Sequence, residues 1–172
     1  MSKRFFDPRV LAVTALMTAI TFALTRVVQV PTPVVGYIHL GDVGVFFSAF
    51  AFGPWVGAVA GGLGTALSDF TSGAYAQWAP YSLLIHGLQG LAAGWISSKW
   101  RNVGGLVFST VVGGVIVVVG YLLAGTSMKG FAAALTEVPL NIVQVSVGAI
   151  VSIPLFLAVR RAYPPIMRLG RR

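Results

Sequence analysis

The sequence has no cysteine and little charge, with only four acidic residues among 172. Without cysteine, disulfides and thiolate metal sites are excluded. Charged residues make up 9% of the chain, whereas soluble domains carry about 25%, so a soluble globular domain is excluded as well. The chain is instead 56% hydrophobic with a mean hydropathy of +0.86. These values are typical of a polytopic membrane protein, and the length favours one integral membrane domain, residues 1–172.

The motifs of several enzyme classes are also missing. The nearest glycine-rich run, Gly61 to Thr65, lacks the lysine of a phosphate-binding loop. The sequence contains no HExxH motif, and two histidines far apart make a weak case for a metal site. We therefore expect a protein that is not an enzyme and that needs no metal or cofactor.

Apolar runs, separated by glycine, proline or polar residues, predict six transmembrane helices. The first run has about 20 residues, too long for the apolar region of a signal peptide, so it is taken as a retained helix. The pair Gly53-Pro54 interrupts a run that could otherwise be one tilted span, and we place a tight turn there. The expected helices are 10–30, 42–53, 54–71, 79–98, 103–124 and 136–159.

The basic residues favour an even number of crossings. With six helices and the N-terminus inside, ten of the twelve lysines and arginines are cytoplasmic: Lys3, Arg4, Arg9, Lys99, Arg101, Arg160, Arg161, Arg168, Arg171 and Arg172. Only Arg26 and Lys129 lie toward the outside. Five helices would expose one basic terminus, against the positive-inside tendency. The net charge of +8 is therefore explained by topology and anionic lipid, and no nucleic-acid partner is expected.

Small residues recur every fourth position on two of the expected helices. The first helix carries Ala15, Ala19 and Ala23, and the third carries Gly57 and Gly61. This spacing lets helix backbones approach closely in lipid. For the glycines, packing inside the bundle is the simpler explanation. The alanine stripe fits internal packing and a partner's helix equally well, and the sequence leaves both open.

Polar side chains inside the spans are the candidates for binding chemistry. On the sixth helix Glu137, Asn141 and Gln144 share one face, because they are spaced i, i+4 and i+7. With the topology above, all such residues fall in the outer half of the bundle, where they could line a cavity with aromatic walls. The candidates are Arg26, His39, Asp42, Asp69, Trp78, Tyr81, Ser82, His86, Gln89, Glu137, Asn141 and Gln144.

Most of these residues also have a purely structural explanation. His39 could be an exposed loop residue, and His86 could hydrogen-bond between helices. Asp42 and Asp69 could cap helices or pair with Arg26. Tyr75, Trp78 and Tyr81 could form an interfacial aromatic belt, and Glu137 could lie in head-group water because it opens its helix. The cluster is thus stronger evidence for a site than any one member.

Three segments carry a resemblance to a known family: ALMTA at 15–19, GYIHLGDVGVFFSAFAFGPWVGAVAGGLGTALSDF at 36–70, and WAPYSLLIHGLQGLAAG at 78–94. In these the chain resembles the substrate-binding S component of energy-coupling-factor (ECF) vitamin transporters. The resemblance extends over the whole chain in length and helix count, but only the first ninety or so residues match specifically. It implies an all-α bundle of six transmembrane helices that binds a vitamin or its precursor near the extracellular side.

The resemblance also implies partners and roles for residues. Ala15, Ala19 and Ala23 would dock on the energy-coupling transmembrane subunit, and two ABC-type ATPases would drive uptake across a prokaryotic plasma membrane. The loop from Tyr37 to Asp42 would be a lid, and Asn141 with the polar face of the fourth helix would hold the ligand. It does not choose among riboflavin, hydroxymethylpyrimidine or thiamine, pyridoxine and pantothenate. A stand-alone secondary transporter or small channel is the alternative.

Overall fold

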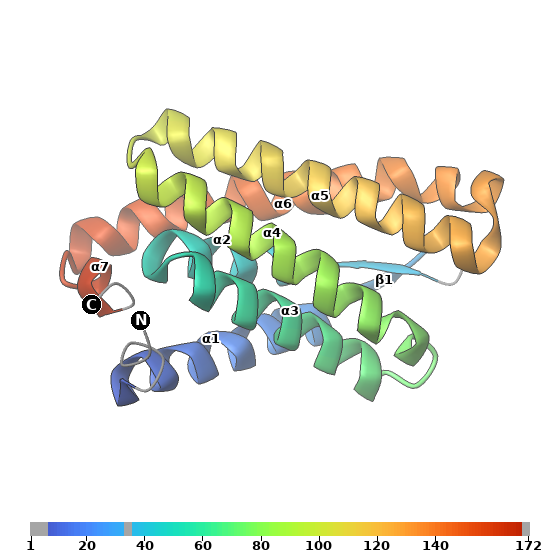
Figure 1. The fold of residues 1–172 in the computed structure, drawn as a ribbon, viewed down its shortest axis with the longest axis horizontal. Helices are drawn as coiled ribbons and strands as arrows, with labels where there is room; N and C mark the ends of the chain where they lie inside the picture. Colours follow the sequence, from blue (N-terminus) through green and yellow to red (C-terminus); the bar gives the residue numbers. More distant parts are fainter. Residues whose placement is uncertain (1–6, 33–35, 170–172) are drawn as a thin grey trace.

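The computed structural model describes residues 7–32 and 36–169, without the side chain of Arg168. Six helices of twelve residues or more dominate this part of the chain, as the sequence predicted (Figure 1). The basic residues Lys3, Arg4, Arg171 and Arg172 lie outside the described residues. The elements are α1 (Pro8–Val27), β1 (Gln29–Pro31), β2 (Tyr37–His39), α2 (Gly41–Phe52), α3 (Pro54–Thr71), η2 (Ala76–Trp78), α4 (Ala79–Lys99), α5 (Val103–Lys129), α6 (Phe131–Ala162) and α7 (Ile166–Leu169).

The short helix α2 forms the centre of the bundle. Its 12 residues span about 18 Å at 1.5 Å per residue, less than a hydrocarbon core of about 30 Å. Helices α1, α3, α4 and α6 pack around it, and every residue of α2 except Phe47 is buried. A helix that is apolar on all sides is stable only when it is enclosed in this way. Helix α2 therefore supplies the core of the bundle rather than a complete crossing.

Three of the described helices are long and apolar enough to cross a membrane, namely α1, α5 and α6. Both α5 and α6 are longer than the sequence predicted. Near the end of α5, Thr126 and Ser127 donate to carbonyls of the preceding turn at 2.7 Å, so polar residues continue the helix there. Helix α6 begins at Phe131, and Glu137 lies inside it. The explanation of Glu137 as a helix-opening residue was therefore wrong.

A tight turn joins α2 to α3 at the end of the bundle that also holds the start of α1 and helix α7 (Figure 1). Gly53 has a φ of 95°, and Pro54 then begins α3, where its missing N–H costs no hydrogen bond. The hairpin β1–β2 and the α5–α6 turn lie at the opposite end. This arrangement agrees with an even number of helices. Which end faces the cytoplasm stays a prediction from the charges.

Glycines bring α3 and α4 into backbone contact. A Cβ on Gly90 would overlap the carbonyl of Gly57, and a Cβ on Gly61 would lie 2.7 Å from the carbonyl oxygen of His86. The glycines thus pack inside the bundle. The alanine stripe does not: Met17, Thr21 and Thr25 are the buried residues of α1, and Ala15, Ala19 and Ala23 face outward.

The α3–α4 contact predicts a contrast between two glycines of α4. We expect Gly90→Ala to lower the free energy of unfolding by about 1–3 kcal/mol, because the added methyl group separates the two backbones. Gly87→Ala is the matched control, since its Cβ would meet its nearest neighbour at 3.7 Å, an ordinary contact. Thermal unfolding of the purified protein in detergent measures both. Equal melting temperatures for the two variants would contradict the prediction.

Candidate functional site

A two-stranded hairpin covers one end of the bundle. Strands β1 and β2 pair antiparallel, with His39 opposite Gln29 and Tyr37 opposite Pro31. The amide of Thr32 donates to the carbonyl of Gly36 at 2.9 Å, which closes the base of the hairpin loop. The sequence predicted that the first helix continues to residue 30 and that a loop follows. This was wrong, because α1 ends at Val27 and strands of three residues, one of them proline, give little periodic signal.

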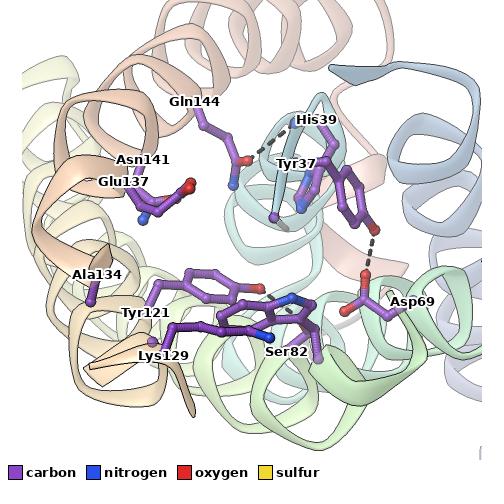
Figure 2. Close-up of a pocket in the computed structure, with 13 residues that line it drawn as sticks. Tyr37, His39, Asp69, Ser82, Tyr121, Lys129, Ala134, Glu137, Asn141 and Gln144 are labelled. Carbon is purple, nitrogen blue, oxygen red and sulfur yellow. Dashed lines mark hydrogen bonds between the residues drawn. The ribbon is translucent and has the colours of Figure 1, made fainter. Parts of the chain in front are cut away.

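A cavity lies beneath the hairpin and between the ends of α3, α4, α5 and α6 (Figure 2). Eight of its lining residues were expected from the sequence: Tyr37, His39, Asp69, Trp78, Ser82, Glu137, Asn141 and Gln144. Five more were not: Gly36, Tyr121, Gly125, Lys129 and Ala134. Tyr121 could have been found, because it is a lone hydroxyl-bearing side chain in an apolar run. Gly125 and Ala134 have no polar side-chain atom and give no such signal.

The cavity is narrow in this structure. Its volume of about 40 Å³ is far below the roughly 300–1,000 Å³ of most small-molecule sites. Tyr37 lines the cavity and is held in place on the hairpin: its hydroxyl bonds to Asp69 and its ring centre lies 4.4 Å from that of Tyr75. A vitamin-sized ligand therefore enters only when the hairpin or its side chains move.

The lining combines aromatic rings with more acidic than basic side chains. Trp78 and Tyr121 meet edge to face with ring centres 5.9 Å apart. Asp69 and Glu137 are the acidic lining residues, and Lys129 is the basic one. Burial, followed by the charge of Asp69, raises the pKa of Tyr37 above its usual range, so its phenol stays protonated and donates. Such a lining suits a flat ring that carries N–H donors or positive charge.

A buried carboxylate lies under the cavity and connects its walls. Asp42 has no exposed surface, and its two oxygens accept from the side-chain amides of Gln89 and Gln144. The carbonyl oxygen of Gln144 accepts from the backbone N–H of His39 at 3.1 Å. One side chain of α6 thus ties the hairpin to α2. The explanation of Asp42 as a helix cap or a partner of Arg26 was therefore wrong.

Several expected site residues lie outside the cavity lining. Arg26 donates to Gln29 and Ser72, both at 3.1 Å, and this exposed clasp joins α1 to the end of α3. Tyr81 packs beside Trp78 with ring centres 6.2 Å apart. His86 and Gln89 are fully buried below the lining and hydrogen-bond to each other. Whether these four residues affect binding stays a prediction.

Two structural explanations offered by the sequence are wrong. His39 is only 7% exposed and lines the cavity, so it is not an exposed loop residue. Trp78 is buried and lines the cavity too, so it does not belong to an aromatic belt. The short connection through η2 places Trp78 at the start of α4 and turns its ring inward.

Gln144→Leu tests the connection between the hairpin and Asp42. We expect a loss of about 2–3 kcal/mol in the free energy of unfolding, because a buried charge and a backbone N–H lose their partner. Asn141→Leu, one turn earlier on the same face, removes an amide that does not bond to Asp42 and should cost less. Thermal unfolding in detergent compares them. A smaller loss for Gln144→Leu than for Asn141→Leu would refute this role.

His39 predicts how stability changes with pH. Burial, and then the neighbouring His86, lowers the pKa of His39 from its ordinary 6.5 to about 3. Between these values the unfolded chain binds a proton that the folded chain does not, so stability falls as the pH falls through this window. Melting temperatures from pH 7 to pH 4 should decline less steeply in His39→Phe than in the wild type. Parallel curves would exclude His39 as the cause.

Comparison with known proteins finds one family and two relatives that this chain is similar to. Residues 6–161 match the family described as "ECF-type riboflavin transporter, S component". The chain is 36% identical over 144 residues to the thiamine precursor transporter HmpT of Lactococcus lactis subsp. cremoris (strain MG1363), covering 83% of this chain and 82% of that protein. It is 35% identical over 144 residues to an uncharacterised protein of Pyrococcus woesei, covering 83% and 96%.

A solved structure shares the fold. The S component of a bacterial ECF transporter superposes with a TM-score of 0.65 over 90% of this chain and 96% of that one, at 20% sequence identity. At this identity the likeness concerns the fold alone. The family match covers nearly the whole chain, and the membrane bundle with its covered polar cavity fits it. The chain belongs to the ECF-type riboflavin transporter S component family.

Proposed function

We propose that this S component binds a vitamin precursor of the aminopyrimidine type for an ATP-driven ECF importer. The observation that carries the proposal is the acidic, aromatic cavity under the hairpin, formed by Asp69, Glu137, Trp78 and Tyr121. The family name refers to riboflavin and the relative HmpT to a thiamine precursor. We favour the smaller of these two ligands, because the cavity of about 40 Å³ has to widen less to admit one ring than to admit the three rings of a flavin.

In the proposed complex the lining residues make different contacts with the ligand. The aromatic rings of Trp78 and Tyr121 provide flat apolar walls for a heteroaromatic ring. The carboxylates of Asp69 and Glu137 can accept from N–H or O–H groups of the ligand, and Asn141 can both donate and accept. The hairpin then closes over the ligand and excludes water, which strengthens each of these polar contacts.

The outward face of α1 supports a membrane-embedded partner for this protein. Ala15, Ala19 and Ala23 are exposed and form a smooth stripe on which another membrane helix can pack closely. In this proposal the stripe contacts the energy-coupling transmembrane subunit, and two ABC-type ATPases supply the energy. The S component itself catalyses no reaction. The assembly lies in the plasma membrane of a prokaryote, with both termini of this chain in the cytoplasm.

A binding assay tests the substrate. The purified protein should bind hydroxymethylpyrimidine with nanomolar affinity and no sodium requirement, and riboflavin at least tenfold more weakly. Glu137→Gln should weaken binding about tenfold or more, because a charge-assisted hydrogen bond is lost. Arg101→Gln, an exposed position at the end of the bundle away from the cavity, should leave affinity unchanged. Sodium-dependent micromolar binding, or transport into liposomes by this chain alone, would favour a secondary transporter instead.

A second experiment tests the docking stripe. Ala19→Trp should abolish co-purification with the ATPase-bearing complex while ligand affinity stays at the wild-type value, because the indole blocks close helix approach without reaching the cavity. Ile20→Trp is the control, since it adds the same ring to an exposed neighbouring position about 100° around the helix. Equal co-purification of both variants would exclude the stripe as the contact.

A further inference from the structure

His86 has an unpaired nitrogen deep in the bundle. The side chain has no exposed surface, and Nε2 has no hydrogen-bond partner in the part of the chain that the structure describes. Buried polar atoms without a partner are rare and need an explanation. The other ring nitrogen, Nδ1, lies 2.7 Å from Oε1 of Gln89. The two nitrogens of one ring therefore have different surroundings.

A chain of hydrogen bonds determines which nitrogen of His86 carries the proton. The Asp42 carboxylate only accepts, so the amide nitrogen of Gln89 must face it. Oε1 of Gln89 then faces His86, and this oxygen also only accepts. Nδ1 of His86 must therefore donate to it. In the neutral ring, Nε2 is left as an acceptor.

His39 carries its proton on the other ring nitrogen. Its Nδ1 accepts from the backbone N–H of Gly41 at 3.1 Å, so the proton of the neutral ring is on Nε2. Burial lowers the pKa of His39 to about 3 and keeps this ring neutral. The rings of His39 and His86 have centres 5.4 Å apart. Two adjacent imidazoles thus offer one donor and one acceptor.

One ring lies in the wall of the cavity and the other lies beneath the lining. His39 lines the cavity, and Figure 2 shows His39 across it from Tyr121. The His86 ring packs edge to face against Tyr121 with centres 5.7 Å apart. On its other side, Nδ1 faces Gln89, with Asp42 at 3.9 Å. A ligand therefore reaches His86 only when Tyr121 moves.

We propose that His39 and His86 form a donor–acceptor pair that recognises a ligand edge bearing a hydrogen-bond acceptor beside an N–H donor. The inference rests on the proposed function, since it requires that a ligand bind in this cavity. The edge of a 4-aminopyrimidine, with a ring nitrogen beside an amino group, is complementary to the pair. Asp42 and Gln89 do not touch the ligand in this scheme. They are positioning residues that set the tautomer of His86.

The chain is well suited to a direct test, because it contains only two histidines. Nitrogen-15 NMR of the full-length protein, labelled at histidine and purified without a histidine tag, reads both tautomers before any ligand is added. We expect His86 protonated at Nδ1 and His39 at Nε2, with His39→Phe and His86→Phe assigning the signals. The same tautomer in both rings, or an imidazolium signal for His86 at neutral pH, would overturn the proposal.

Asp42→Asn separates positioning from simple structural support. The introduced amide can donate as well as accept, so Gln89 can turn over and the tautomer of His86 should become mixed while His39 stays unchanged. A loss of stability alone would not change this NMR signature. An unchanged His86 signal in this variant would show that Asp42 does not set the tautomer.

The ligand part of the test compares hydroxymethylpyrimidine with its analogue that lacks the 4-amino group. We expect the wild type to bind the amino compound at least tenfold more tightly, and His86→Phe to lose most of that preference. A preference that survives in His86→Phe would overturn the proposal. If neither compound nor any other vitamin binds, the proposed function fails. The tautomer signals then decide separately whether the two rings have the inferred polarity.

Discussion

The buried carboxylate of Asp42 is the interaction on which the rest of this structure depends. A charge without exposed surface inside a membrane bundle persists only when its oxygens are hydrogen-bonded. Amides from α4 and α6 meet this need, and they thereby fix two helices and the hairpin around α2. The same constraint requires that α2 be surrounded by other helices, because its polar first turn and its apolar remainder both need partners.

The hydrogen bonds of Asp42 and Gln144 link the base of the cavity to the hairpin that covers it. Gln144 faces the cavity, Asp42 and the backbone of His39 at once, so a change at any of these positions affects the others. Apart from the bond between His39 and Gln144, the hairpin is held by the exposed hydrogen bonds of Arg26 and by the bond from Tyr37 to Asp69. Segments that must open for a ligand are expected to have few buried contacts of their own.

Helix positions and residue types were readable from the sequence, and the contacts between distant segments were not. Apolar runs and the Gly53-Pro54 break located all six long helices of the described chain, and the spacing of Glu137, Asn141 and Gln144 predicted that all three line one cavity. Periodicity could not show that Arg26 turns to Ser72 instead of Asp42, since that choice depends on how α1 and α3 end in space. The hairpin was missed because three-residue strands have no pattern.

The sequence by itself determined the solvent and the type of fold, because hydropathy and the side on which basic residues collect depend only on composition along the chain. It also determined which residues could bind a polar ligand. Only the tertiary structure decided which of them do the lining and which lie below it. In the folded protein Asp42, His86 and Gln89 form a buried hydrogen-bonded network. Tyr121 and Lys129, which the sequence did not single out, line the cavity. The physical reason is that burial and hydrogen-bond partners arise from residues far apart in sequence, and these meet only when the helices pack.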